Sequence, residues 1–133
     1  MWVIARKAGL APIEFPGRAP LAAAIAGAGL LIDIVSVAAF IRARTTVNPL
    51  APEKANALVI SGLYRVSRNP MYLGMALVLA GWAIWLGQPL TLLPVAAFVA
   101  LIEVMQIRPE EKALEEKFGD DYRRYKKRVR RWI

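Results

Sequence analysis

Three long apolar stretches alternate with polar, mostly basic segments along this chain of 133 residues. Residues 21–41 contain a single charged side chain, Asp33; residues 71–88 contain none; and residues 89–107 contain only Glu103. A helix of about twenty residues, rising ~1.5 Å per residue, spans the ~30 Å hydrocarbon core of a bilayer. The pattern therefore predicts an all-α integral membrane protein, a helical bundle with about three transmembrane helices.

Asparagine, glycine and proline residues mark where these helices begin and end. The first helix is expected over about 20–41. Asn69 can cap free N–H groups, and the proline that follows it loses no hydrogen bond at the first helical position, so a second helix is expected over about 70–86. The sequence Gly-Gln-Pro at 87–89 then reverses the chain into a third helix over about 89–107. Helices two and three should form an antiparallel hairpin.

Residues 1–19 mix charged and apolar positions ahead of the first apolar stretch. Prolines and charges interrupt this segment, so it does not resemble a cleaved signal peptide. We expect an interfacial or partly re-entrant segment anchored by Trp2 and Phe15. The alternative is a disordered tail. Residues 1–133 are treated as a single domain.

Residues 42–70 and 108–133 carry fifteen of the eighteen Lys and Arg residues, whereas the reversal at 87–89 carries no charge. Basic segments that flank membrane helices usually stay in the cytoplasm, so we expect both segments to be cytoplasmic. The membrane is expected to be an inner membrane of bacterial type. After Gly119, aromatic and apolar residues recur at helical spacing and predict a C-terminal amphipathic helix at the membrane surface. These residues are Tyr122, Tyr125, Val129 and Trp132.

Composition narrows the chemistry that the chain can perform. It contains no cysteine and no histidine, which removes disulfides, thiolate nucleophiles and the commonest metal ligands and general base. No metal site is therefore expected. The net charge is +8, but the basic residues flank apolar stretches, so a nucleic-acid partner is not expected.

The start of the second helix gathers groups that can bind an anion. Arg68, Asn69 and Tyr72 lie beside the N-terminal, positive end of a helix, where free N–H groups attract carboxylate or phosphate. Gly74, one turn further on, would let a flat ligand approach the backbone. The alternative is that the arginine extends toward lipid phosphates and Tyr72 belongs to an aromatic belt.

Four acidic residues are the other candidates for a functional site. Because of the hairpin, Glu110 and Glu111 should lie level with the start of the second helix, where they can hold a cation or ribose hydroxyls. Their alternative role is to favour a helix N-terminus. Placing a carboxylate such as that of Asp33 or Glu103 in the hydrocarbon core costs free energy. Each should therefore face protein, water or a ligand, or form a structural hydrogen bond. Glu103 and Glu110 share a face if the third helix has no kink.

Three motifs in order resemble the isoprenylcysteine carboxyl methyltransferase and phospholipid methyltransferase superfamily of integral membrane enzymes. That family has Arg-His-Pro-x-Tyr-x-Gly at the start of a membrane helix, then paired glutamates, then Phe-Gly-x-x-Tyr-x-x-Tyr. Here the corresponding stretches are Arg68-Asn69-Pro70-Met71-Tyr72-Leu73-Gly74, Glu110-Glu111 and Phe118-Gly119-Asp120-Asp121-Tyr122-Arg123-Arg124-Tyr125. The resemblance covers about 45–133.

The resemblance implies that these motifs surround S-adenosylmethionine. Asn69 and Tyr72 would then contact the cofactor, Gly74 would give clearance, and Glu110 and Glu111 would hold its amino or ribose end. The family histidine is an asparagine in this chain. Because asparagine does not ionise near neutral pH, this position can bind but cannot act as an acid or base.

Glu103 and Arg68 are the candidate catalytic residues. An amine acceptor would have to arrive neutral or lose its proton to Glu103, Glu110 or Tyr72. The expected function is methyl transfer to a lipophilic acceptor that enters from the bilayer, with a lipid or lipophilic small molecule as substrate. The alternative is a non-enzymatic membrane subunit or anionic-lipid-binding module. Three spans are few for the family, so a homo-oligomer is conceivable. We expect Arg131→Ala, a substitution in the tail, to leave cofactor binding nearly intact.

Overall fold

The computed structural model describes residues 1–7, 12–45 and 54–133. Residues 8–11 and 46–53, parts of the predicted N-terminal segment and polar connection, lie outside the described residues. The described part of the chain is helical and has no strand, apart from one isolated bridge between Ser67 and Arg130. The predicted all-α class is confirmed.

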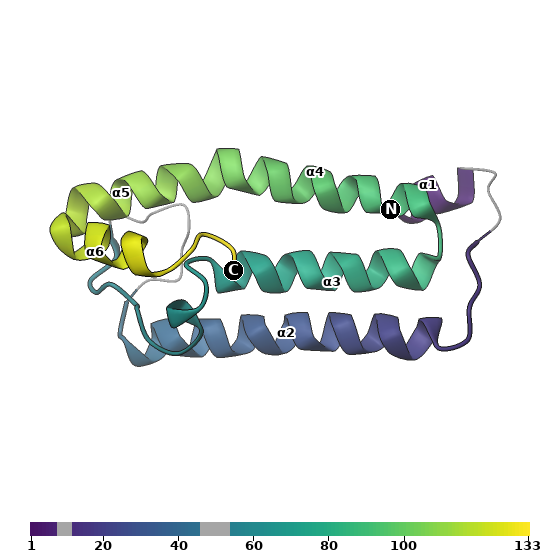
Figure 1. Cartoon of the computed structure of the whole chain (residues 1–133), viewed down its shortest axis with the longest axis horizontal. Helices are drawn as coiled ribbons and strands as arrows, with labels where there is room; N and C mark the ends of the chain where they lie inside the picture. The colour runs from purple at the N-terminus through teal and green to yellow at the C-terminus, as the bar shows by residue number, and fades with distance from the viewer. Residues whose placement is uncertain (8–11, 46–53) are drawn as a thin grey trace.

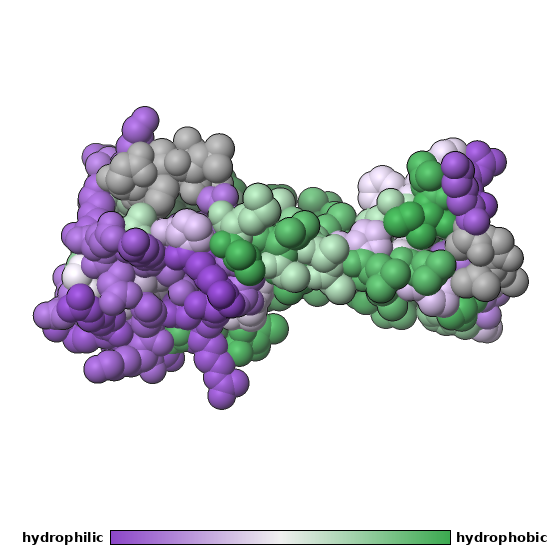
Figure 2. Space-filling view, turned by 90° about the horizontal axis from the view of Figure 1, so that it is seen from above, coloured by the Kyte–Doolittle hydropathy of each residue, from purple (hydrophilic) through white to green (hydrophobic). Residues whose placement is uncertain are grey.

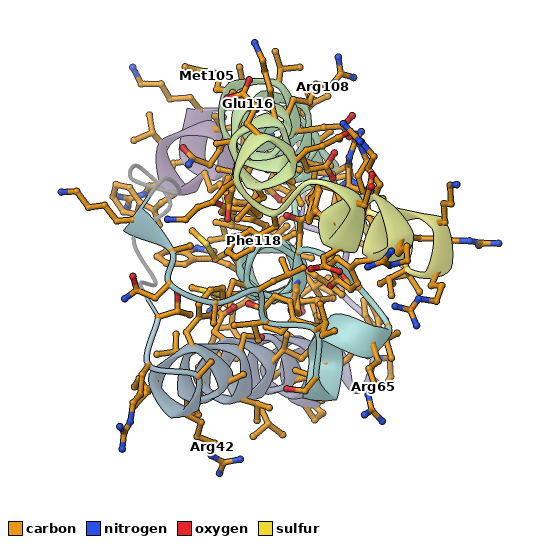
Figure 3. All side chains as sticks on the ribbon, turned by 90° about the vertical axis from the view of Figure 1, so that its left-hand side faces the viewer. Arg42, Arg65, Met105, Arg108, Glu116 and Phe118 are labelled. Atoms are coloured by element: carbon orange, nitrogen blue, oxygen red, sulfur yellow. The ribbon has the colours of Figure 1, made fainter. Side chains whose placement is uncertain are left out.

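Helices α2 (Arg18–Arg42) and α3 (Pro70–Leu86) form the main packing contact of the molecule. They lie antiparallel and side by side, with α3 in the middle of a row of three rods (Figures 1 and 3). Glycines permit the contact: a Cβ built on Gly29 would lie 2.6 Å from the backbone oxygen of Gly74. Small residues allow two helix backbones to approach closely in this way.

The predicted hairpin is present. Helix α3 ends at Leu86, and Gly87 adopts φ 67°, a left-handed conformation that glycine accepts without strain. The short turn Pro89–Thr91 leads into α4 (Leu92–Ile102). The Thr91 hydroxyl donates a hydrogen bond to the Gln88 carbonyl at 2.5 Å, which ties the reversal together.

The third rod continues past the predicted end at residue 107. After α4 come a π-helical segment (Glu103–Ile107) and α5 (Arg108–Phe118), without a break in the helix. Pro109 cannot donate a backbone hydrogen bond and its ring crowds the carbonyl four residues earlier. A wider π-helical turn just before the proline relieves this conflict, so the helix need not stop.

Within the described residues, two helices are long and apolar enough to cross a membrane: α2, with 25 residues, and the rod Pro89–Phe118, with 30 residues. Helix α3, with 17 residues, is shorter. Hydrophobic residues cover the middle of the molecule, and hydrophilic residues gather at the end that holds α6 (Figure 2). The molecule thus fits a membrane protein, and the third predicted span stays a prediction.

The N-terminus lies at the hairpin end, opposite the C-terminal tail (Figure 1). Helix α1 (Trp2–Lys7) contacts the Pro89–Thr91 turn, and the Ile13 N–H donates a hydrogen bond to the Gly87 carbonyl at 2.7 Å. Trp2 is 54% exposed, as an interfacial anchor would be. The predicted anchoring role of the segment stays a prediction.

The polar end is built from a 3₁₀ turn (Gly62–Arg65) and α6 (Asp120–Arg128). Gly119, with φ 53°, separates α5 from α6, as predicted. However, α6 is shorter than predicted, because Val129 is already extended, with φ −123° and ψ 129°. Tyr122, Tyr125 and Val129 are buried together against the rest of this end.

A buried hydrogen bond joins α6 to the 3₁₀ turn: the Tyr125 hydroxyl donates to the Tyr64 carbonyl at 2.7 Å. In Tyr125→Phe the carbonyl would stay buried without its donor, which we expect to lower the free energy of unfolding by about 1–3 kcal/mol. Thermal unfolding in detergent would measure the loss. An unchanged unfolding curve would show that water replaces the hydroxyl.

Candidate functional site

A pocket of about 280 Å³ opens at the polar end, between α3, the α4–α5 rod, α6 and the end of α2. Its apolar side includes methionine, isoleucine, leucine, valine and alanine side chains. Its aromatic lining comes from four different elements: Phe40, Tyr64, Tyr72, Tyr122 and Tyr125. Its polar lining consists of Arg68, Asn69, Gln106, Glu110 and Glu111. The hairpin therefore brings Arg68, Asn69 and Tyr72 to the same cavity as Glu110 and Glu111.

Tyr72 and Glu110 meet across this cavity. Tyr72 lies in the first turn of α3, and its hydroxyl donates a hydrogen bond to Oε2 of Glu110 at 3.0 Å. Glu110 lies in the first turn of α5, 38 positions further along the chain. Among the described residues, Glu110 makes no ion pair, unlike its neighbour Glu111. A carboxylate in a largely apolar pocket without a cation is a natural partner for a positively charged ligand group.

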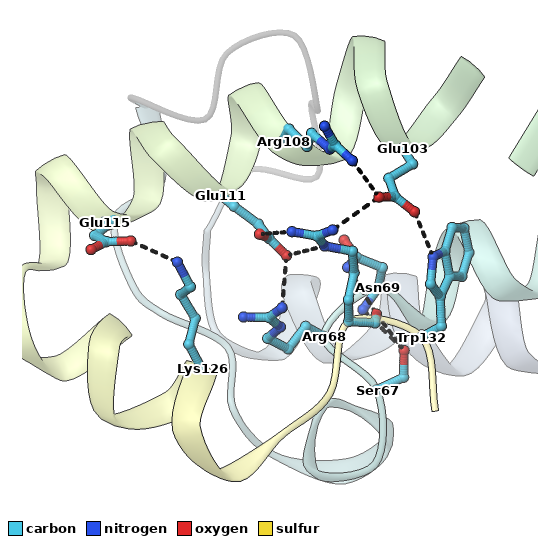
Figure 4. Close-up of polar contacts among 10 residues, drawn as sticks. Ser67, Arg68, Asn69, Glu103, Arg108, Glu111, Glu115, Lys126 and Trp132 are labelled. Carbon is cyan, nitrogen blue, oxygen red and sulfur yellow. Dashed lines mark hydrogen bonds and ion pairs between the residues drawn. The ribbon is translucent and has the colours of Figure 1, made fainter. Parts of the chain in front are cut away.

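Arg68 and Glu111 form a buried ion pair, with 3.1 Å between the guanidinium and carboxylate and side chains only 9% and 8% exposed. Glu111 also accepts two hydrogen bonds from Arg131, at 3.1 and 2.9 Å (Figure 4). Both of its oxygens are therefore engaged by the protein. The Arg68 Nε, in contrast, is buried and has no hydrogen-bond partner within the described part of the chain.

Asn69 lies at the predicted start of α3 but does not cap it through its side chain. Its side-chain amide instead donates a hydrogen bond to the Arg131 carbonyl at 3.0 Å, while its own N–H donates to the Ser67 hydroxyl at 3.1 Å. The residue is 8% exposed and lines the pocket. Asn69 therefore joins the start of α3 to the C-terminal residues.

Glu103 is not among the residues that line the pocket, and its predicted catalytic role stays a prediction. Its carboxylate pairs with Arg108 and Arg131, each at 3.0 Å, and accepts a hydrogen bond from Trp132 at 3.3 Å (Figure 4). The prediction that Glu103 shares a face with Glu110 assumed a regular helix. The π-helical turn between them changes the angular step per residue, so the two carboxylates point to different surroundings.

Gly74 also lies away from the pocket. It faces α2, where an added Cβ would collide with Asp33 and lie 2.7 Å from the Gly29 carbonyl. The clearance that this glycine provides therefore serves helix packing within this structure. Asp33 packs beside it, and its Oδ1 has no hydrogen-bond partner among the described residues.

Three residues of this site were missed in the sequence analysis. The bridge that Arg131 forms between Glu103 and Glu111 was not predicted. Trp132 was assigned to an amphipathic helix that in fact ends at Arg128, and no local signal indicates its contact with Glu103. Gln106 lines the pocket one helical turn before Glu110, a spacing that could have been noticed.

Burial raises the pKa of three of the tyrosine hydroxyls that line the pocket above the ordinary value. This holds for Tyr64, Tyr122 and Tyr125, and nearby carboxylates raise the pKa of Tyr64 and Tyr122 further. All three therefore remain protonated at physiological pH. They can donate hydrogen bonds or stack on a flat ligand, but they do not act as bases there.

Comparisons with known proteins identify the family. The chain is 52% identical over 63 residues to an uncharacterized protein of Haemophilus influenzae, and the match covers 47% of this chain and 100% of that relative. No solved structure matches. Residues 18–121 match the sequence model of a family described as phospholipid methyltransferase, which confirms the resemblance seen in the motifs. The chain therefore belongs to the phospholipid methyltransferase family.

Proposed function

We propose that the chain transfers a methyl group from S-adenosylmethionine to a lipophilic acceptor at the cytoplasmic membrane interface. One observation carries the proposal: Glu110 lines the pocket, accepts a hydrogen bond from Tyr72 and forms no ion pair within the described residues. A partly buried carboxylate is costly unless a cation or several donors compensate it. S-adenosylmethionine carries both an ammonium and a sulfonium group.

The remaining pocket residues fit the same ligand. The buried Nε of Arg68, which has no partner among the described residues, and the N-terminal end of α3 suit a carboxylate. Tyr64 and Tyr122 suit a flat ring such as adenine. The volume of about 280 Å³ lies just below the range of ~300–1,000 Å³ that is usual for small-molecule sites. These features support S-adenosylmethionine as the cofactor.

When bound, S-adenosylmethionine supplies a methyl group activated by a positive sulfur. Methyl transfer is an in-line displacement, so most of the acceleration comes from alignment of the reactants, ~3–3.5 Å apart, in a site without water. The task of this chain is then to bind and orient. An amine acceptor would also have to lose a proton, for which Glu110 is the suitable base, since Glu111 is held by two arginines.

The apolar side of the pocket supports an acceptor with a hydrocarbon part. Met71 and Met75 of α3 and Ile102 of α4 line it, and Met75 is 43% exposed on the outside of the bundle. These residues belong to α3 and α4, the two apolar helices of the hairpin. We propose that the acceptor reaches the pocket from the bilayer while the cofactor enters from the cytoplasm, and that the protein resides in an inner membrane.

Transfer of radiolabelled methyl groups tests this function directly. Purified protein in detergent, S-adenosylmethionine labelled in its methyl group, and a bacterial lipid extract are expected to give a labelled species that partitions into organic solvent. Its identification would show whether oxygen, nitrogen or sulfur is methylated. The matched control is the same protein with Glu110→Gln. A complete absence of labelled lipid, together with absence of cofactor binding, would favour a non-enzymatic membrane subunit.

A further inference from the structure

The last residues of the chain, 129–133, form an extended segment that we call the C-terminal strap. The strap leaves α6 and runs beside the start of α3 (Figure 4). The Arg68 N–H donates a hydrogen bond to the Arg130 carbonyl at 3.0 Å, and the Asn69 side chain donates to the Arg131 carbonyl at 3.0 Å. Backbone and side-chain hydrogen bonds thus attach the strap to the residues that line the pocket.

The Arg131 side chain extends these attachments to the third rod. Its Nε and one terminal nitrogen bind the two oxygens of Glu111 at 3.1 and 2.9 Å, and its other terminal nitrogen binds Glu103 at 3.0 Å. The Trp132 indole N–H donates to the second oxygen of Glu103 at 3.3 Å. One guanidinium therefore connects α5 with the π-helical turn, using the forked geometry that distinguishes arginine from lysine.

We propose that Arg131 is a positioning residue that holds Glu111, so that Arg68 keeps a free donor and Glu110 remains the unpaired carboxylate of the pocket. This inference rests on the proposed function. Without Arg131, Arg68 would be the sole cation for Glu111 and would have to satisfy both carboxylate oxygens. The Arg68 guanidinium would then rotate to form two hydrogen bonds with Glu111. Its Nε, which is now available to a ligand, would be used in that pairing.

Calorimetric titration of S-adenosylmethionine into the full-length protein in detergent tests this role. Arg131→Ala is expected to weaken binding roughly tenfold or more, because it leaves a buried carboxylate short of its partner. The same substitution made in a Glu111→Gln protein should cause no further loss, since the effect passes through Glu111. Arg128→Ala is the matched control, because Arg128 is an exposed cation at the end of α6 and should leave binding unchanged.

A conservative variant keeps the test decisive if Arg131→Ala does not fold. Arg131→Lys retains the charge but cannot bind both oxygens of Glu111 and Glu103 at once, so roughly three- to tenfold weaker binding is expected with an unchanged unfolding temperature. Binding equal to that of the wild type would overturn the positioning role. The role would also be overturned if the affinity losses of Arg131→Ala and Glu111→Gln multiplied in the double variant, since the two residues would then act independently.

The same titration separates this inference from the proposed function. If the wild-type protein shows no saturable binding of S-adenosylmethionine, the proposed cofactor is wrong, and the role of Arg131 falls with it. If the wild type binds and Arg131→Ala binds equally well, the cofactor assignment stands and only the positioning role is wrong.

Discussion

Glu110→Gln is expected to weaken S-adenosylmethionine binding about 10- to 150-fold, the equivalent of losing one hydrogen bond or ion pair to a charged group. The substitution keeps an oxygen that can accept the hydrogen bond from Tyr72, so the pocket should retain its shape. What it removes is the negative charge. Because no cation of the described protein residues pairs with that charge, its loss should affect the ligand much more than the fold.

The matched control is Glu116→Gln, six positions further along α5. Glu116 is an exposed carboxylate, 69% exposed at its side chain, with a distant pairing to Lys112 at 3.9 Å. It points away from the bundle (Figure 3). Calorimetry should show wild-type affinity for this variant. Equal losses in both variants would mean that overall charge, and not the pocket carboxylate, governs binding.

The hairpin and the convergence of its two motifs could be predicted because the signals are local. Asn69 followed by proline fixes the start of α3, and Gly87 with Pro89 fixes the reversal, whatever the rest of the chain does. Once two helices of similar length are joined by a tight turn, the start of one must lie level with the end of the other. The meeting of Tyr72 and Glu110 follows from that geometry.

The π-helical turn and the strap could not be predicted in the same way. A proline at position 109 can stop a helix, kink it or be absorbed by a wider turn, and local sequence does not decide between these outcomes. The strap is held by contacts between Arg131 and acids 20 and 28 positions earlier in the chain. The periodicity of apolar residues indicates only which residues share a face of one helix. It therefore predicted a helix through Trp132 and gave no sign of these contacts.

Gly29→Ala should lower the stability of the protein, because it adds a methyl group at the α2–α3 contact. The new Cβ would lie 2.6 Å from the Gly74 oxygen and 2.9 Å from the Val78 nitrogen. Both are backbone atoms of α3, which cannot rotate away as a side chain would. Overpacking of this kind costs about 1–3 kcal/mol, which should lower the unfolding temperature by several degrees.

Gly27→Ala is the matched control, because the same methyl group two positions earlier would meet no atom within 4 Å. Alanine is the better helix former by about 1 kcal/mol, so this variant should unfold at the same or a slightly higher temperature. Similar losses in both variants would show that glycine is needed for the helix itself and not for the α2–α3 contact. Thermal unfolding in detergent distinguishes these outcomes.

The α2–α3 contact should also affect ligand binding, because α2 supplies one wall of the pocket. Phe40, near the end of α2, packs edge-on against Tyr64 with ring centres 5.4 Å apart, and both rings line the cavity. If Gly29→Ala pushes α2 away from α3, this wall moves outward while Glu110 and Tyr72 stay in place. Weaker S-adenosylmethionine binding in folded Gly29→Ala protein, with normal binding in Gly27→Ala, is therefore expected. Unchanged affinity would show that the cofactor does not contact the α2 side of the pocket.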